Sequence, residues 1–252
     1  MVKSKILFLD VENSPNLSWI WGHYEQNAIG VEKAWHLLSF SAKWQGGKQI
    51  TKGLCDYSGY KDDKENDYQL VSDLYDLISQ ADVIVAHNGD KFDIKKINTR
   101  LVHWTFTPPK PYKTVDTLKV ARRHFAFNSN KLDDLGEFLG LGRKTETGGK
   151  SLWFDCMSGN KSAWKKMKEY NAQDVILLEK VYNELLPWIN NHPRVSNKEM
   201  ACPKCGSDEL QNRGKQITVT GLEYQRYQCQ SCGGWCRSLL GERVIKPLVN
   251  AK

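Results

Sequence analysis

Long apolar runs, internal repeats and low-complexity tracts are all missing from this chain of 252 residues. No segment approaches the roughly 20 apolar residues that a membrane-spanning helix needs, so no membrane partner is expected. The first residues, MVKSKILFLDVE, lack a small-residue cleavage site and carry acids within their first apolar run. This pattern predicts a strand and not a signal peptide, and we therefore expect a cytoplasmic protein.

Disulfide bonds are not expected either, although the chain has seven cysteines. Their number is odd, no export signal is seen, and five of them fall between Cys202 and Cys236. This arrangement indicates a reducing compartment and a bound metal. Acidic residues do not balance the basic ones, and the net charge of +7 favours a polyanionic partner.

Apolar patterning predicts an α/β fold, with a mixed sheet and helices packed on it. Strands are expected at 5–12, 34–44, 49–57 and 82–88, and helices at 67–80, 92–104, 131–140 and 162–189. Proline and polar residues then interrupt the pattern and indicate a linker. The predicted domain organisation is a larger domain at 1–189, a linker at 190–200, and a cysteine-rich module with a basic tail at 201–252.

Two carboxylates stand together at the end of the first predicted strand. Side chains at positions i and i+2 of a strand point to the same face, so Asp10 and Glu12 share one face. Like charges this close repel unless a cation lies between them, and carboxylate oxygens suit Mg²⁺ or Mn²⁺. The residues alone also allow a simpler interpretation, in which the strand ends here and both acids face solvent.

A third acid interrupts the apolar stripe of the predicted helix 162–189. A buried carboxylate without a partner is costly, so Asp174 needs a metal, an arginine or a backbone donor. Tyr170 lies one helical turn earlier on nearly the same face. The stripe, at alternating spacings of three and four residues, consists of Trp164, Met167, Asn171, Asp174, Leu178, Val181 and Leu185.

A fourth acid follows the predicted strand 82–88. Asp93 begins the next helix, where a carboxylate is commonly a cap, and Asp90 is its rival for any ligand role. Together, acids in the order D-x-E, N-G-x-x-F-D and Y-x-x-x-D can hold two divalent ions. Such a pair activates a water and stabilises the leaving oxygen in phosphodiester cleavage.

These motifs resemble those of the DEDD 3′–5′ exonucleases of the RNase H-like superfamily, in the subtype with tyrosine in the third motif. The resemblance is to phage-type and bacterial members and covers roughly residues 5–189. It runs through FLDVENSP, ADVIVAHNGDKFDIKKIN, PYKTVDTLKVARRHF, NKLDDLGEFLGLG and YNAQDVILLEKVY. It implies an RNase H-like mixed sheet flanked by helices, in a prokaryotic or phage-infected cell. The ligands of two Mg²⁺ or Mn²⁺ ions would be Asp10, Glu12, Asp93 and Asp174.

The resemblance also implies an enzyme, a 3′–5′ exodeoxyribonuclease that prefers single-stranded DNA or 3′ ends and acts in replication, repair or recombination. Tyr170 would orient the attacking water, because a tyrosine with an ordinary pKa near 10 is a poor general base at pH 7. A histidine subtype is disfavoured because Glu169 occupies the position five residues before Asp174. Three alternatives stay open: a structure-specific DNA endonuclease, an RNA exonuclease, and a catalytically silent nucleic-acid-binding protein.

Six residues around these motifs are candidate substrate contacts. The asparagine of the second motif either hydrogen-bonds the terminal nucleotide or braces its loop. Two tryptophans after the first motif offer rings on which bases stack, although most tryptophans pack in cores. A basic run either tracks phosphates or forms a solvated face. The six residues are Asn88, Trp19, Trp21, Lys113, Arg122 and Arg123.

Four cysteines near the C-terminus form two Cys-x-x-Cys pairs. Their spacing is C-x₂-C-x₂₃-C-x₂-C, at which two knuckles close a tetrahedral site for one structural Zn²⁺, as in a zinc ribbon. The metal would stabilise a module that is too small for its own core. Basic residues around the cysteines favour DNA binding, with docking of a replication protein as the alternative. The zinc ligands would be Cys202, Cys205, Cys229 and Cys232, with Cys236 as a spare thiol.

Overall fold

The structure is a computed structural model of the chain, and residues 4–24, 27–143 and 149–244 are described. It divides into two compact units. The larger unit is Lys5–Tyr182, and the C-terminal unit comprises Met1–Ser4 and Asn183–Lys252. Within the described ranges, no helix combines the length and the hydropathy needed to cross a membrane.

A five-stranded mixed sheet forms the centre of the larger unit, in the order β5-β4-β1-β6-β7. Strand β1 pairs antiparallel with β4 and parallel with β6, and β6 pairs parallel with β7. The predicted mixed α/β sheet is thereby confirmed, with the first predicted strand at its centre. The strands are β1 (Ile6–Asn13), β4 (Leu37–Trp44), β5 (Gln49–Gly53), β6 (Val83–Ala86) and β7 (Lys113–Asp116).

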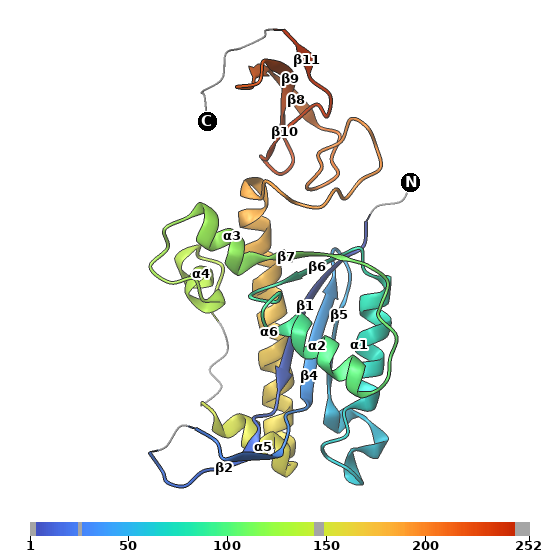
Figure 1. The fold of residues 1–252 in the computed structure, drawn as a ribbon, viewed down its shortest axis with the longest axis vertical. Coiled ribbons are helices and arrows are strands. Elements are labelled where there is room, and N and C mark those ends of the chain that lie inside the picture. The colour runs from blue at the N-terminus through green and yellow to red at the C-terminus, as the bar shows by residue number, and fades with distance from the viewer. Residues whose placement is uncertain (1–3, 25–26, 144–148, 245–252) are drawn as a thin grey trace. The chain divides into compact units, whose positions relative to one another are not determined.

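Helices flank this sheet, with α6 running beside it and α1 on the other side (Figure 1). Side chains of β1 alternate between the faces: the Phe8 ring packs edge-on against Tyr182 of α6, with centroids 5.3 Å apart. Leu7 and Leu9 belong to a core cluster that includes residues of α1 and α2. The helices are α1 (Tyr68–Gln80), α2 (Asp93–His103), α3 (Thr117–His124), α4 (Leu132–Phe138), α5 (Ser151–Ser158) and α6 (Lys161–Leu185).

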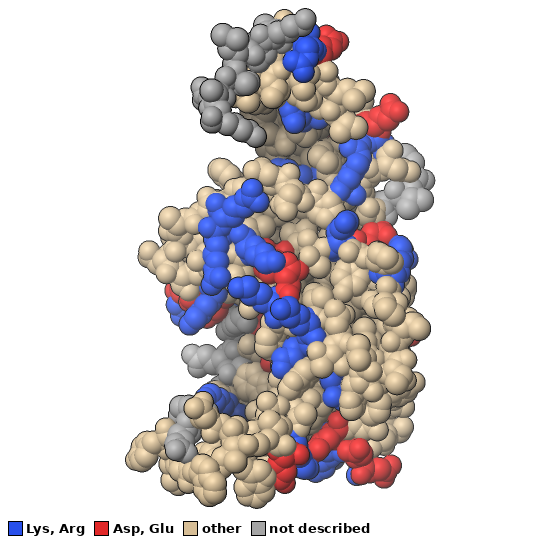
Figure 2. Space-filling model, in the orientation of Figure 1, with Lys and Arg blue, Asp and Glu red and all other residues tan. Residues whose placement is uncertain are grey.

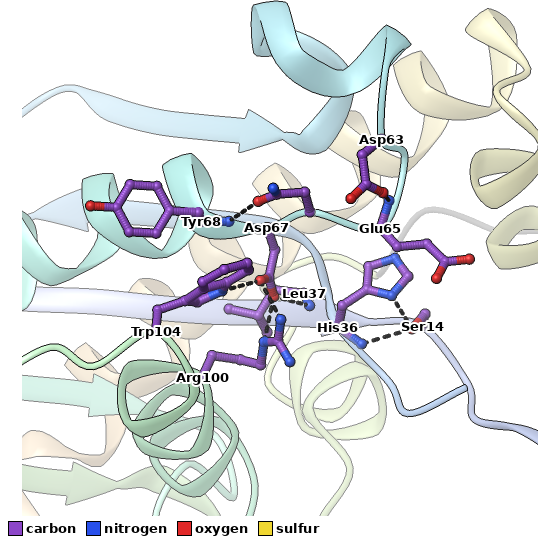
Figure 3. A network of polar contacts seen from close by, with 10 residues as sticks. Ser14, His36, Leu37, Asp63, Glu65, Asp67, Tyr68, Arg100 and Trp104 are labelled. Carbon is purple, nitrogen blue, oxygen red and sulfur yellow. Dashed lines mark hydrogen bonds and ion pairs between the residues drawn. The ribbon is translucent and has the colours of Figure 1, made fainter. Parts of the chain in front are cut away.

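A buried ion pair joins three of these elements (Figure 3). Asp67, which is fully buried before α1, accepts hydrogen bonds from Arg100 Nε at 2.7 Å and Nη2 at 2.6 Å. It also accepts from Trp104 Nε1 at 2.6 Å and from the Leu37 backbone N–H at 2.8 Å. Four donors therefore hold one carboxylate, and this carboxylate ties α2 and the start of β4 to the start of α1.

Replacing Asp67 with asparagine is expected to lower the free energy of unfolding by about 3–5 kcal/mol, because Arg100 would remain buried without its counter-charge. Urea denaturation of the pure protein measures this loss. Asp76→Asn is the matched control, since Asp76 is exposed on α1. A loss below about 1 kcal/mol, the range of exposed pairs, would contradict a stabilising role for the buried pair.

A hairpin that the sequence did not predict follows β1. Strands β2 (Leu17–Trp19) and β3 (Gly30–Lys33) pair antiparallel and form a sheet of their own. Apolar side chains of this hairpin lie exposed instead of packing in the core. They are Leu17, Trp19, Ile20, Trp21, Ile29 and Val31.

The C-terminal unit is built on a small antiparallel sheet in which β9 pairs with β8, β10 and β11. Residues 190–200, predicted as a linker, contribute to this unit: Val195 is fully buried, and its N–H donates to the Pro203 carbonyl at 3.0 Å. The strands are β8 (Leu210–Ile217), β9 (Leu222–Cys229), β10 (Trp235–Arg237) and β11 (Glu242–Arg243).

Candidate active site

Three carboxylates from two elements meet beside the central strand. Asp10 and Glu12 of β1 and Asp174 of α6 each offer an oxygen, and these oxygens all lie within 4.8 Å of one another. Asp174 is 1% exposed, while the other two are half-buried. Strand alternation places Asp10 and Glu12 on one face of β1, and α6 brings Asp174 to that face. Carboxylate oxygens in such a group match the ligand preference of Mg²⁺ and Mn²⁺.

Two neutral side chains hold the β1 acids, and neither was predicted. Asn171 of α6 donates from Nδ2 to Asp10 Oδ2 at 2.5 Å and accepts from Ser39 Oγ at 3.2 Å. Trp153 of α5 donates from Nε1 to Glu12 Oε2 at 3.3 Å. Asn171 could have been found from the sequence, because a polar residue within the apolar stripe of the helix indicates a buried side chain that needs a hydrogen-bond partner. Trp153 had no such signal, because its contact spans 141 residues of sequence.

Tyr170 lies one turn before Asp174 and is half-buried. Its hydroxyl hydrogen-bonds to the Asp174 carboxylate, and its ring packs edge-on against Trp153 with centroids 6.1 Å apart. Burial, followed by the negative charges of Asp174, Glu12 and Asp10, raises the pKa of Tyr170 above its ordinary value of 10. The phenol is therefore protonated at neutral pH and donates its hydrogen bond to the Asp174 carboxylate.

Asp93 approaches the same strand from the start of α2. It is 3% exposed, and its Oδ1 accepts a hydrogen bond from the Val11 N–H at 3.1 Å. This N–H lies beyond Phe8, where the pairing of β1 with β6 stops. Asp93 thus contacts β1 between Asp10 and Glu12, but it is not one of the three acids grouped within 4.8 Å. Its rival Asp90 forms an ion pair with Lys119 at 2.5 Å.

The turn that presents Asp93 depends on the asparagine and glycine of the second motif. Asn88 has a φ of 65°, and its N–H donates to Asp116 Oδ1 at 2.9 Å. The same carboxylate oxygen caps α3 through the Leu118 N–H at 3.0 Å. At Gly89, a Cβ would lie 2.3 Å from the Cβ of Ala86, so no side chain fits there. The Asn88 backbone is therefore tied to the carboxylate that caps α3.

The remaining candidate substrate contacts lie in three places. Trp19 and Trp21 are 62% and 83% exposed, on the hairpin that follows the β1 acids. Lys113 is exposed at the start of β7, in register with Val83. Because β1, β6 and β7 are parallel and Val83 pairs with Ile6, Lys113 lies at the end of the sheet away from the acids.

Two arginines lie exposed in the last turn of α3. Figure 2 shows lysine and arginine side chains gathered over this helix and next to it. The two residues are Arg122 and Arg123, and they form an exposed positive surface at this end of α3. Its effect on a polyanion would be electrostatic and would weaken as salt rises.

The four predicted zinc ligands form a second cluster, within the C-terminal unit. The sulfur atoms of Cys202, Cys205, Cys229 and Cys232 all lie within 4.8 Å of one another. Two of the sulfur–sulfur distances are 3.7 Å and 3.6 Å. Four thiolates at about 2.3 Å from a tetrahedral Zn²⁺ lie about 3.8 Å apart, so this cluster fits a zinc module. Cys236 is half-buried and lies outside the cluster.

Comparison with known proteins identifies the larger unit. A sequence profile of the RNase H superfamily matches residues 37–186, more than half of the chain. The chain belongs to the RNase H superfamily. The matched range of this RNase H-like chain contains Asp93, Tyr170 and Asp174, and β1 is joined to it through its pairing with β4 and β6. Superfamily membership together with the acid group supports a nuclease that acts on nucleic acid.

The RNase H-like fold is also similar to part of a solved structure, the family B DNA polymerase from the hyperthermophilic archaeon Pyrobaculum calidifontis. The two are 15% identical, with a TM-score of 0.55, over 73% of this chain and 25% of the polymerase chain. The chain therefore spans about a quarter of the polymerase, and the likeness is one of fold. No curated protein sequence matches the chain.

Proposed function

We propose that the chain is a metal-dependent 3′–5′ exonuclease of the DEDD type, tyrosine subtype, acting on DNA with single strands preferred. One observation carries the proposal: Asp10, Glu12 and Asp174 bring three carboxylates together beside the central strand. Asp93 would be the fourth acid. The fold likeness to a DNA polymerase favours DNA as the substrate and a place in replication, repair or recombination.

The donor set fits divalent ions, because hard carboxylate oxygens are what Mg²⁺ and Mn²⁺ prefer, and we propose that two such ions are bound. Held by the four acids, such ions would lower the pKa of a water and stabilise charge on the leaving oxygen. Asn171 and Trp153 orient the carboxylates of Asp10 and Glu12. The protonated Tyr170 hydroxyl would position the attacking water by hydrogen bonding.

A labelled single strand tests this function. The pure protein is incubated with 5′-labelled DNA and with Mg²⁺, Mn²⁺ or EDTA, beside a strand whose 3′ end is blocked. We expect a metal-dependent ladder that shortens from the free 3′ end and is absent on the blocked strand. Discrete internal cuts would support the endonuclease alternative, and cleavage of matching RNA alone would support an RNA exonuclease. Binding without cleavage of any of these substrates would overturn the proposal.

Tyr170→Phe is expected to lower kcat about 10- to 100-fold with little change in KM. The ring packing against Trp153 is kept, and only the hydroxyl that positions water is lost. Single-turnover cleavage measures the chemical step directly. An unchanged kcat would show that the hydroxyl has no part in the reaction.

The exposed tryptophans of the hairpin are expected to hold the substrate strand. Each base stacked on an aromatic ring contributes about 1–3 kcal/mol, so Trp19→Ala or Trp21→Ala should weaken single-strand binding at least about fivefold. Fluorescence anisotropy measures the Kd, and Val102→Ala on α2 is the control, because Val102 is also exposed and apolar. Equal affinities of all three variants for the single strand would contradict a stacking role of the tryptophans.

The C-terminal unit would be a zinc ribbon that helps to hold DNA, with a replication protein as the alternative partner. Its four sulfurs have the spacing that one structural Zn²⁺ requires. The zinc would be closed off by four thiolates and would have a structural role only.

A further inference from the structure

A pocket of about 490 Å³ opens within the C-terminal unit. Its walls come from residues 189–192, which follow α6, and from Pro203 and Lys204, which lie between Cys202 and Cys205. Strands β9 and β10 also contribute to them. The volume is within the range of small-molecule sites. The pocket lining includes Lys204, Arg226, Trp235 and Arg237.

The pocket is positively charged. Three of its lining residues are cations, and none of the described residues that line it is acidic. Lys204 is 5% exposed and donates to the Pro187 carbonyl, and burial lowers its pKa from the ordinary value. The two arginines are different, because neither forms an ion pair with any acid in the described part of the chain. A phosphate would supply the counter-charge that Arg226 and Arg237 lack.

Arg226 also carries a buried donor that needs an acceptor. Its Nε is buried and, among the described residues, has no hydrogen-bond partner. Among the same residues, its Nη2 donates only to the Arg213 carbonyl, at 3.4 Å. A buried N–H without an acceptor is unfavourable, and a ligand oxygen in the pocket would satisfy it.

The same wall offers an aromatic surface. Trp235 is 51% exposed, and the guanidinium of Arg226 lies 5.9 Å from its ring centroid. On the neighbouring position of the sheet, the guanidinium of Arg237 lies 3.8 Å from the ring centroid of Tyr224. A cation beside an exposed indole matches the two parts of a nucleotide. The phosphate pairs with the cation, and the base stacks on the indole.

We propose that this pocket binds one nucleotide of a single-stranded DNA, with its phosphate between Arg226 and Arg237 and its base on Trp235. A strand is favoured over a duplex because only an unstacked base can lie on the indole. The choice of DNA rests on the proposed nuclease function. The pocket itself rests on the charge, the unsatisfied donor and the exposed ring.

Binding of labelled oligothymidylate by the full chain tests the proposal, in an Asp174→Asn background that suppresses cleavage. Arg226→Gln and Arg237→Gln are each expected to weaken binding about tenfold and to reduce the slope of log K against log salt by about 0.7. Trp235→Ala should weaken it at least about fivefold, and Trp235→Phe should restore most of the affinity. Arg243→Gln is the control, because it removes the same charge from β11, outside the pocket.

Unchanged binding by the pocket variants, at unchanged unfolding midpoint and zinc content, would overturn the proposal. Equal losses in Arg243→Gln would also overturn it, because they would indicate diffuse electrostatics. Competition by free thymidine monophosphate as strong as by the strand would assign the pocket to mononucleotides instead. Cleavage by the chain with intact acids is measured separately. If that chain fails to cut while the pocket variants lose binding, the nuclease proposal fails and the pocket stands.

Discussion

Replacing Asp174 with asparagine is expected to lower the rate of DNA cleavage at least about a thousandfold, because several kcal/mol of transition-state stabilisation depend on the metal ligands. Asparagine keeps the size of the side chain and an oxygen that can accept the Tyr170 hydrogen bond. The loss should therefore come from the missing charge and not from packing. Initial rates on labelled single strands in Mg²⁺ measure it.

The unfolding temperature provides an independent readout of the same variant. Without divalent ions, Asp174→Asn should unfold at the same temperature as the parent or higher, because one of three mutually repelling charges is gone. Added Mg²⁺ should stabilise the parent through binding to the folded state, and should stabilise the variant less. Glu169→Gln is the matched control, since Glu169 is an exposed acid on the same helix. Near-parent turnover by pure Asp174→Asn would refute the site.

If the four cysteines bind zinc as proposed, loss of that zinc is expected to unfold the C-terminal unit while the larger unit stays folded. Structural zinc in small peptides contributes about 10–16 kcal/mol of binding free energy at pH 7, more than a core of this size supplies. Cys205→Ser, or a chelator that competes for zinc, should make β8 and β9 sensitive to protease. Limited proteolysis with mass spectrometry, beside zinc analysis, measures both effects.

Cys236→Ser is the matched control for the zinc prediction. This thiol lies on β10, close in sequence to Cys232 but outside the four-sulfur cluster. It should therefore keep one zinc per chain and the protease resistance of the parent. Loss of zinc in this variant, or its retention in Cys205→Ser, would show that the ligand set has been assigned wrongly.

The sequence predicted the elements whose burial shows in a local pattern. The run 5–12 is apolar on both faces and became the central strand β1, and the stripe of 162–189 became α6. Asp174 stood out because a charge within an apolar stripe needs an explanation, and it is indeed buried. The helix ends at Leu185 and is followed by a short 3₁₀ turn that contains Pro187.

Contacts between distant segments could not be predicted in the same way. Trp153 on Glu12, and Arg100 on Asp67, depend on how elements pack and leave no periodic signal in their own segments. The hairpin after β1 was not predicted because its apolar side chains are exposed. Its strands therefore lack the alternation of apolar and polar residues by which a strand with one buried face is recognised. The backbone contact of Asp93 was also hidden, since it depends on where β6 ends beside β1.

The distances between the acids of the group depend on how α6 is aligned along β1. Asn171, which holds Asp10, and Asp174 are both carried by α6, so any sliding of that helix along β1 displaces them as a rigid body. The packing of Phe8 against Tyr182 fixes this alignment, and Tyr182 lies about 12 Å along the helix from Asp174. In the proposed nuclease, a substitution in this aromatic pair would therefore shift Asp174 relative to Asp10 and Glu12 and change metal binding, although all four acids are kept in the sequence.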